Sequence, residues 1–239
     1  MIAFFAIFTV LGQQTAVSPT SAPAPAWTQR YLEFKTIAGL GSSAAATRLV
    51  ALLKLENAVV ADTLKASAGR DGVSTTLGEG YSEYYSQLLA EVAARGKAGD
   101  DDAIAAAADG IYSPDSLVGS FVLSRWQVAL PVLENMSHED GPRRSQALGM
   151  LGLVVNLHRS ALSDKELKSI QEAILAGLDD PNVDVRLTAI RAVVAARVVS
   201  ALPSLRRLAA DDRATVKAQT GVRFPVRDEA AKAIGVLQE

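Results

Sequence analysis

The chain has 239 residues, of which 49% are apolar and 5% aromatic, and its formal net charge is −2. This length corresponds to one or two domains, and the apolar content is sufficient for a buried core. A core with few aromatic residues must be built mainly from Ala, Leu, Val and Ile, which favours closely packed helices over a β-sandwich. The nearly balanced charge excludes the basic face that nucleic-acid binding requires.

The sequence contains no cysteine, which excludes several kinds of site. Disulfides, iron–sulfur clusters, thiolate zinc sites and cysteine nucleophiles all need that residue. The sequence also lacks the G-x-S-x-G, H-E-x-x-H and Walker motifs. We therefore predict no catalytic residue, no metal ligand and no cofactor, and we expect the chain to be non-enzymatic.

Residues 1–26 have the pattern of a secretory signal followed by a linker rich in Pro and Ala. The apolar run from Ile2 to Leu11 is shorter than the roughly 20 residues that span a bilayer. Ala24-Pro25-Ala26 fits the cleavage rule for signal peptides, and Thr20-Ser21-Ala22 is an alternative site. The segment before the apolar run has no Lys or Arg, so a loose hydrophobic tail on a cytosolic protein is the other interpretation. We expect export to the periplasm or the cell exterior, with no stable membrane span after signal removal.

From residue 27 onward the apolar spacing is helical nearly everywhere. The N-terminal helical region, residues 27–114, is expected to contain helices at 43–67, 77–95 and 102–112. The second region, residues 115–239, is expected to contain helices at 115–136, 142–157, 164–178, 182–197, 201–211 and 225–238. The signals for helix starts are a capping box and prolines in first turns, at Ser163 with Glu166, Ser113-Pro114-Asp115, Pro142, Pro181, Pro203 and Pro225.

Three helices of the second region repeat one pattern. Arg144, Arg186 and Arg227 lie 42 and then 41 residues apart, and each is followed by small or apolar residues at offsets +3, +4 and +7. These offsets place the following residues on one face of a helix. A helix pair that recurs at this period is the unit of a HEAT or armadillo stack.

The segment from Leu178 to Ile190 resembles a HEAT repeat, with its D-P turn at Asp180-Pro181 and its V-R pair at Val185-Arg186. The segment from Val226 to Gly235 resembles the second helix of another repeat, although an insertion replaces its D-P turn. Arg144 opens a third and weaker copy, so the resemblance covers residues 115–239.

The resemblance to HEAT repeats implies an all-α fold, a right-handed α-solenoid of HEAT-like hairpins with an N-terminal helical cap. In that family the Asp and Arg of the turn connect neighbouring repeats. The resemblance therefore implies a structural role for Arg144, Asp180, Arg186 and Arg227.

A helical wheel of the 182–197 segment separates three faces. The expected core face has Val183, Leu187, Ile190 and Val194, the small face has Ala189, Ala192 and Ala196, and the polar face has Asp184, Thr188 and Arg191. The polar residues at offsets +2 and +5 from the three arginines are Gln146, Thr188, Arg191, Glu229 and Lys232. We predict that these five form a polar row on one surface. Second helices line the concave side of such stacks, where partners bind.

The mixed charges of this row suit a protein or peptide partner and not a phosphate backbone. An ordinary solvated face is the alternative interpretation. The sequence therefore predicts an exported, non-enzymatic HEAT-like scaffold that binds a protein or peptide. Two further alternatives are a HEAT-like lyase or chaperone acting on a bound prosthetic group, as some relatives with such repeats do, and a structural subunit of an envelope assembly.

Two other groups of residues allow both a functional and a structural interpretation. Tyr81, Tyr84 and Tyr85 suit an interface, but they share a face with leucines, so core packing is favoured, as it is for Trp27 and Trp126. His138-Glu139-Asp140 could suggest a metal or acid–base site. Adjacent residues in a turn rarely converge on one metal, so we expect no such role.

Overall fold

The computed structural model describes residues 25–40, 42–67, 76–110, 117–139, 141–218 and 221–239. The predicted signal peptide and most of its linker, and the predicted helix start at Ser113-Pro114-Asp115, lie outside these residues. Within the described ranges the fold is helical apart from one short hairpin, which confirms the all-α part of the prediction. In the same ranges, no helix combines the length and the apolar character needed to cross a membrane.

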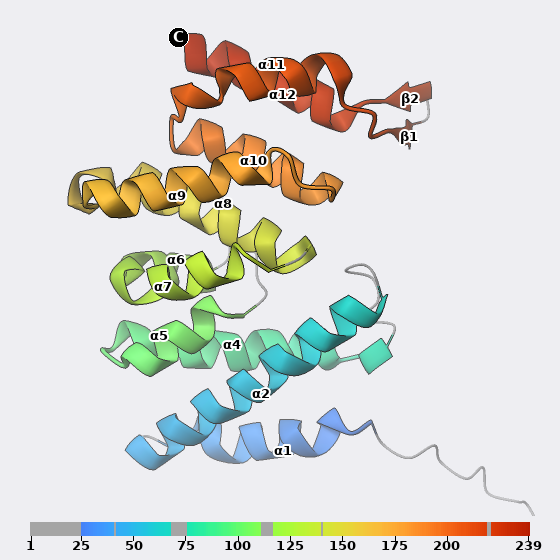
Figure 1. Cartoon of the computed structure of the whole chain (residues 1–239). Coiled ribbons are helices and arrows are strands. Elements are labelled where there is room, and N and C mark those ends of the chain that lie inside the picture. Colours follow the sequence, from blue (N-terminus) through green and yellow to red (C-terminus); the bar gives the residue numbers. More distant parts are fainter. Residues whose placement is uncertain (1–24, 41, 68–75, 111–116, 140, 219–220) are drawn as a thin grey trace, which may run out of the picture.

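The helices lie one above another in chain order, with the N-terminal helices at one end of the molecule and the C-terminal pair at the other (Figure 1). The first half contains α1 (Trp27–Ala38), α2 (Ser43–Ser67), α4 (Tyr81–Lys97), α5 (Asp101–Ala108), α6 (Leu117–Ser124) and α7 (Trp126–Met136). The second half contains α8 (Gly141–His158), α9 (Asp164–Gly177), α10 (Val183–Ala195), α11 (Leu202–Asp211) and α12 (Pro225–Gln238). A single 3-10 turn, Arg159–Ala161, follows α8, and another, Val199–Ala201, precedes α11.

The predicted helix at 115–136 is wrong as a single element, because the chain breaks between α6 and α7. Arg125 stands at the break with φ −124° and ψ 39°, outside the helical region. Its guanidinium donates to the carbonyl of Gly96 at 3.1 Å and also pairs with Asp101. The break therefore places Arg125 against the last turn of α4 and the first turn of α5.

Local signals place the helix starts of the second half well. Ser163 Oγ accepts a hydrogen bond from Glu166 N at 3.3 Å, and the Glu166 carboxylate accepts from Ser163 N at 2.8 Å, which confirms the capping box. Pro225 is the first residue of α12. The expectation for Pro181 was wrong, because Asn182 is the N-cap of α10 and its side chain accepts from Asp184 N at 2.8 Å.

The insertion between α11 and α12 contains a hairpin that the sequence analysis did not predict. Strands β1 (Val216–Ala218) and β2 (Gly221–Arg223) pair antiparallel, with Val216 opposite Arg223. Strands of three residues are too short to show the alternation that identifies a strand in a sequence. The hairpin projects sideways from the stack of helices (Figure 1).

Helix α10 packs most closely on α8 through small residues. A Cβ atom added at Gly152 of α8 would lie 2.8 Å from Ala192 Cα and 2.9 Å from Ala192 Cβ, so only glycine allows this approach. The predicted core face of α10 was therefore only partly right. Among its members only Ile190 is fully buried, whereas Val183, Leu187 and Val194 are half-buried. The fully buried face instead contains Val185, Ala189, Ala192 and Val193.

The tyrosine cluster of α4 is buried, as predicted, and its hydroxyls reach polar groups on α2. Tyr81 and Tyr84 donate to the carboxylate of Glu56 at 2.8 Å and 3.1 Å, and Tyr85 donates to Asn57 Oδ1 at 2.8 Å. Glu56 is fully buried, and it also pairs with Arg30 of α1. The polar cluster thus binds α1, α2 and α4 together.

The two tryptophans differ in burial. Trp126 is buried, as predicted, and stacks on the imidazole of His158 with ring centroids 5.7 Å apart. Trp27 is only half-buried. Its ring stacks on Tyr84 at 5.9 Å, and its indole N–H donates to the carbonyl of Leu77 at 2.8 Å.

Polar contacts also join the first half of the molecule to α8. Asn57 Nδ2 donates to the Asp109 carboxylate at 3.3 Å. The guanidinium of Arg143 pairs with the same carboxylate and donates to the Asp109 carbonyl at 2.8 Å. Gln146 Nε2 donates to the carbonyl of Gly110 at 3.1 Å. These residues connect α2, the end of α5 and the start of α8.

Candidate functional site

Arginines near the start of α8 and α10 each join the loop before their own helix to the loop that precedes the helix two elements later. Arg186 Nη1 donates to the carbonyl of Asp180 at 2.8 Å, in the loop that precedes α10. Its Nε and Nη2 atoms donate to the two carboxylate oxygens of Asp212, at 2.8 Å and 3.2 Å, after α11. Arg144 repeats this arrangement one helix pair earlier. It donates to the carbonyl of His138 at 3.3 Å and pairs with the Asp180 carboxylate.

The two aspartates occupy equivalent turns. One carboxylate oxygen of Asp180 accepts from Asn182 N at 2.7 Å, and one of Asp212 accepts from Ala214 N at 2.9 Å. Arg227 of α12 donates to the carbonyl of Asp212 at 2.6 Å. The structure therefore places all four residues that the HEAT resemblance marks as structural within one repeating set of contacts.

Three of the five residues predicted for the polar row come together between α10 and α12. Glu229 is central, because its carboxylate lies 3.1 Å from Arg191 Nε and 3.7 Å from Lys232 Nζ. A cavity of about 210 Å³ opens beside them. We call this cavity the α10–α12 groove, and its lining is Ile190, Arg191, Val194, Glu229, Lys232, Ala233 and Val236.

The groove combines an apolar floor with a charged rim. Ile190 and Ala233 are buried beneath it, and Val236 at its edge is 46% exposed. The Arg191 and Lys232 side chains are 65% and 73% exposed. Because two cations face one carboxylate, the rim has an excess of positive charge. An apolar surface rimmed by polar groups is the usual anatomy of a protein interface.

The other two residues of the predicted row do not reach this surface. Gln146 is 6% exposed, so its assignment to an exposed row was wrong. It lies on α8, which has neighbouring helices on both sides, whereas α12 ends the stack (Figure 1). Thr188 is half-buried, and its hydroxyl lies 2.8 Å from that of Ser145. These two residues therefore contribute to contacts between helices.

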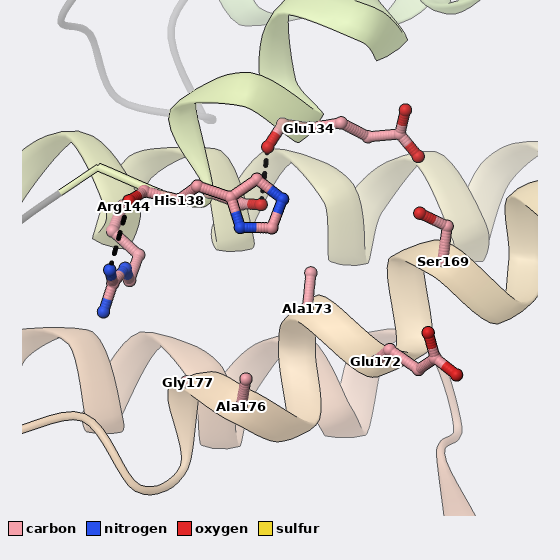
Figure 2. A pocket seen from close by; sticks show the side chains of 9 residues that line it. Glu134, His138, Arg144, Ser169, Glu172, Ala173, Ala176 and Gly177 are labelled. Atoms are coloured by element: carbon pink, nitrogen blue, oxygen red, sulfur yellow. Dashed lines mark hydrogen bonds between the residues drawn. The ribbon is translucent and has the colours of Figure 1, made fainter.

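A second pocket, which the sequence analysis missed, lies between α7 and α9 (Figure 2). Its volume is about 320 Å³, and we call it the α7–α9 pocket. It is lined by Glu134, Ser137, His138, Arg144, Ser169, Glu172, Ala173, Ala176 and Gly177. These residues come from three helices and one loop, so no single sequence motif contains them.

Of the His138-Glu139-Asp140 segment, the two described residues, His138 and Glu139, do not share one site. The His138 side chain borders the α7–α9 pocket (Figure 2), whereas the Glu139 carboxylate pairs with Arg143 at 2.6 Å. Asp140 lies outside the described residues. Over those residues, no group of three or more His, Asp or Glu side chains is placed to hold a metal ion.

No protein-family model matches the chain, and the comparison with curated proteins finds no match.

Proposed function

We propose that the chain is an exported, non-enzymatic scaffold that binds a protein or peptide partner in the α10–α12 groove. In this proposal residues 115–239 form a right-handed α-solenoid of HEAT-like hairpins, and the N-terminal helices cap it. The observation that carries the proposal is the groove itself, where charged side chains of two second helices meet above an apolar floor.

Contacts at the N-terminal ends of α10 and α12 support a preformed docking surface. Arg186 on α10 is paired with Asp212, and Arg227 on α12 donates to the carbonyl of that same aspartate. One residue thus contacts both helices that form the groove, which limits their relative movement. A preformed site loses less conformational entropy on binding than a mobile one.

The groove indicates the chemistry of its partner. The apolar floor would accept an aliphatic or aromatic side chain, and the positive rim would favour a carboxylate next to it. We therefore expect a partner segment that presents an apolar residue beside Asp, Glu or a chain terminus. The exposed cations should mainly accelerate association, so binding should weaken as salt concentration rises.

A site-specific photocrosslinker tests this proposal in the full chain. Placed at Val236 in the groove, it should form one discrete adduct with a protein of the exported fraction. Placed at Leu157 of α8, which is 58% exposed, it should not form that adduct. Isolation of the chain with a tightly bound coloured small molecule would instead support the prosthetic-group alternative.

Charge reversal provides the second half of the test. Arg191→Glu combined with Lys232→Glu should abolish the Val236 adduct, because the rim then repels an acidic segment. Lys54→Glu on α2, an exposed position remote in sequence, is the matched control and should leave the adduct unchanged. An adduct that survives reversal of the rim would contradict the proposal. Sequencing of the mature N-terminus tests export separately, and Trp27 is the expected first residue.

A further inference from the structure

The α7–α9 pocket separates its charged groups. Glu134 comes from the last turns of α7, and Ser169 and Glu172 come from successive turns of α9. In Figure 2 these three side chains lie toward one end of the pocket, and Arg144 lies at the other end. The His138 imidazole lies between the two ends (Figure 2).

The cationic end is already neutralised by the protein. The Arg144 guanidinium pairs with the carboxylate of Asp180, whose side chain is only 2% exposed. Exchange of this buried carboxylate for a ligand anion would leave Asp180 without its ion pair, which is costly. The Arg144 end is therefore unsuited to binding an anion.

The acidic end keeps its negative charge. Glu172 lies 3.8 Å from Lys168, but these side chains are 66% and 78% exposed, so solvent screens the pair strongly. Glu134 is half-buried, and among the described residues its carboxylate has neither an ion-pair partner nor a hydrogen bond. A half-buried carboxylate beside a cavity gains most from a guest that carries positive charge.

The shape of the pocket limits the kind of cation. Ala173, Ala176 and Gly177 form the α9 side, and their small side chains leave room for an alkyl chain or a flat group. The Ser169 hydroxyl can accept a hydrogen bond from an N–H group at the acidic end. A bare metal ion would lack ligands, because no group of three His, Asp or Glu side chains converges in the described part of the chain.

We propose that the α7–α9 pocket binds an organic cation, namely an alkylammonium or alkylguanidinium group. Its charge pairs with Glu134, its N–H groups donate to that carboxylate, and its alkyl part lies along Ala173 and Ala176, while the Glu172 carboxylate adds to the negative charge of this end. A free amine and a Lys or Arg side chain of another protein share this chemistry. The α7–α9 pocket is separate from the α10–α12 groove. The proposal of cation binding therefore does not depend on the partner proposed for the groove.

Calorimetric titration of the full chain with butylammonium, butylguanidinium and butyrate tests the proposal. Both cations should bind and the anion of equal length should not, and added salt should weaken binding. Glu134→Gln should lower the affinity for the cations about tenfold, the effect of losing one hydrogen bond to a charged group. Glu79→Gln, at an exposed position before α4, is the matched control and should bind like the wild type.

A steric variant tests the location. Ala176 is exposed, and leucine is also a good helix former, so Ala176→Leu should fold normally and block cation binding. Titration with capped lysine and arginine derivatives then distinguishes a free amine from a side chain of another protein as the natural cation. Tighter binding than the free amines indicates a protein side chain, and weaker binding indicates a small amine. Equal binding of butyrate, or full cation affinity in both Glu134→Gln and Ala176→Leu, would overturn the proposal.

Discussion

Arg186 and Asp212 form a two-pronged ion pair in which both side chains are largely buried, 13% and 6% exposed respectively. The pair joins the first turn of α10 to the residue that follows α11. Two parallel hydrogen bonds fix orientation as well as distance, which a lysine at position 186 could not do. The spacing between the α9–α10 pair and the α11–α12 pair therefore depends on this contact.

Removal of Asp212 should destabilise the fold strongly. Asp212→Ala leaves the Arg186 guanidinium without its carboxylate and Ala214 N without its acceptor. We expect a loss of about 3–5 kcal/mol in the free energy of unfolding, measured by denaturant titration. Asp211→Ala is the adjacent control. Asp211 is exposed at the C-terminal end of α11, so its replacement should change stability by less than about 0.5 kcal/mol. Equal effects of the two variants would contradict the assigned role.

Gly152→Ala should also destabilise the protein, because its Cβ would lie 2.8 Å from a backbone atom of Ala192. Separation of α8 and α10 should cost about 1–3 kcal/mol, read as a lower denaturation midpoint. Gly235→Ala provides the opposite control within a helix. Nothing lies within 4 Å of a Cβ atom there, so this variant should gain up to about 1 kcal/mol. A neutral Gly152→Ala would mean that the two helices are not tightly packed.

The tyrosines around Glu56 should respond to high pH. Burial raises the pKa of Tyr81 and of Tyr84 well above the usual value, and the nearby Glu56 carboxylate raises both further. Folding therefore favours the protonated phenols, and this stabilisation is complete below about pH 10, the pKa in the unfolded chain. It should disappear progressively as pH rises above that value.

Ultraviolet titration of the phenolates measures this effect. Tyr81 and Tyr84 should ionise only as the helical circular dichroism is lost, and the double variant Tyr81→Phe/Tyr84→Phe should lose less stability above pH 10 than the wild type does. If every tyrosine ionised near pH 10 while the helices stayed intact, the pKa values of Tyr81 and Tyr84 would not be raised by burial and by Glu56.

Gln146 provides a test that separates a buried residue from a surface residue. Gln146→Ala removes the donor to the carbonyl of Gly110 and should cost about 1–3 kcal/mol. Gln87→Ala on α4 loses only an exposed contact with Glu83 and should be nearly neutral. If Gln146→Ala proved neutral as well, the contact between α8 and the end of α5 would carry little stability.

The sequence predicts features that depend on neighbouring residues better than features that depend on distant ones. The capping box of Ser163 and the first-turn proline at 225 identified helix starts because their partners lie within one helical turn. Glu56 was not identified, because its charge at a helix centre resembles that of a solvated residue. The hydroxyl groups that donate to Glu56, those of Tyr81 and Tyr84, lie 25 and 28 residues away in the sequence.

Repeat spacing predicted equivalent backbone positions but not equivalent exposure. Gln146 and Glu229 both lie two residues after a repeat arginine, yet only Glu229 reaches the surface. The difference arises because α8 is inside the stack and α12 is at its end. Burial at a repeat position is a property of the neighbouring helices, which the pattern within one helix does not contain.

The contact between Arg227 and Asp212 connects the two ends of the insertion that contains the hairpin. This contact spans 15 residues, whereas the corresponding contact of Arg186 with Asp180 spans six, so a hydrogen bond from the arginine to a carbonyl of the preceding turn is kept despite the added residues. We therefore expect that the segment between Asp212 and Arg227 can be exchanged without shifting α12. This makes the hairpin a suitable place to graft an affinity tag or a fluorophore, close to the C-terminal helix pair but outside its packing.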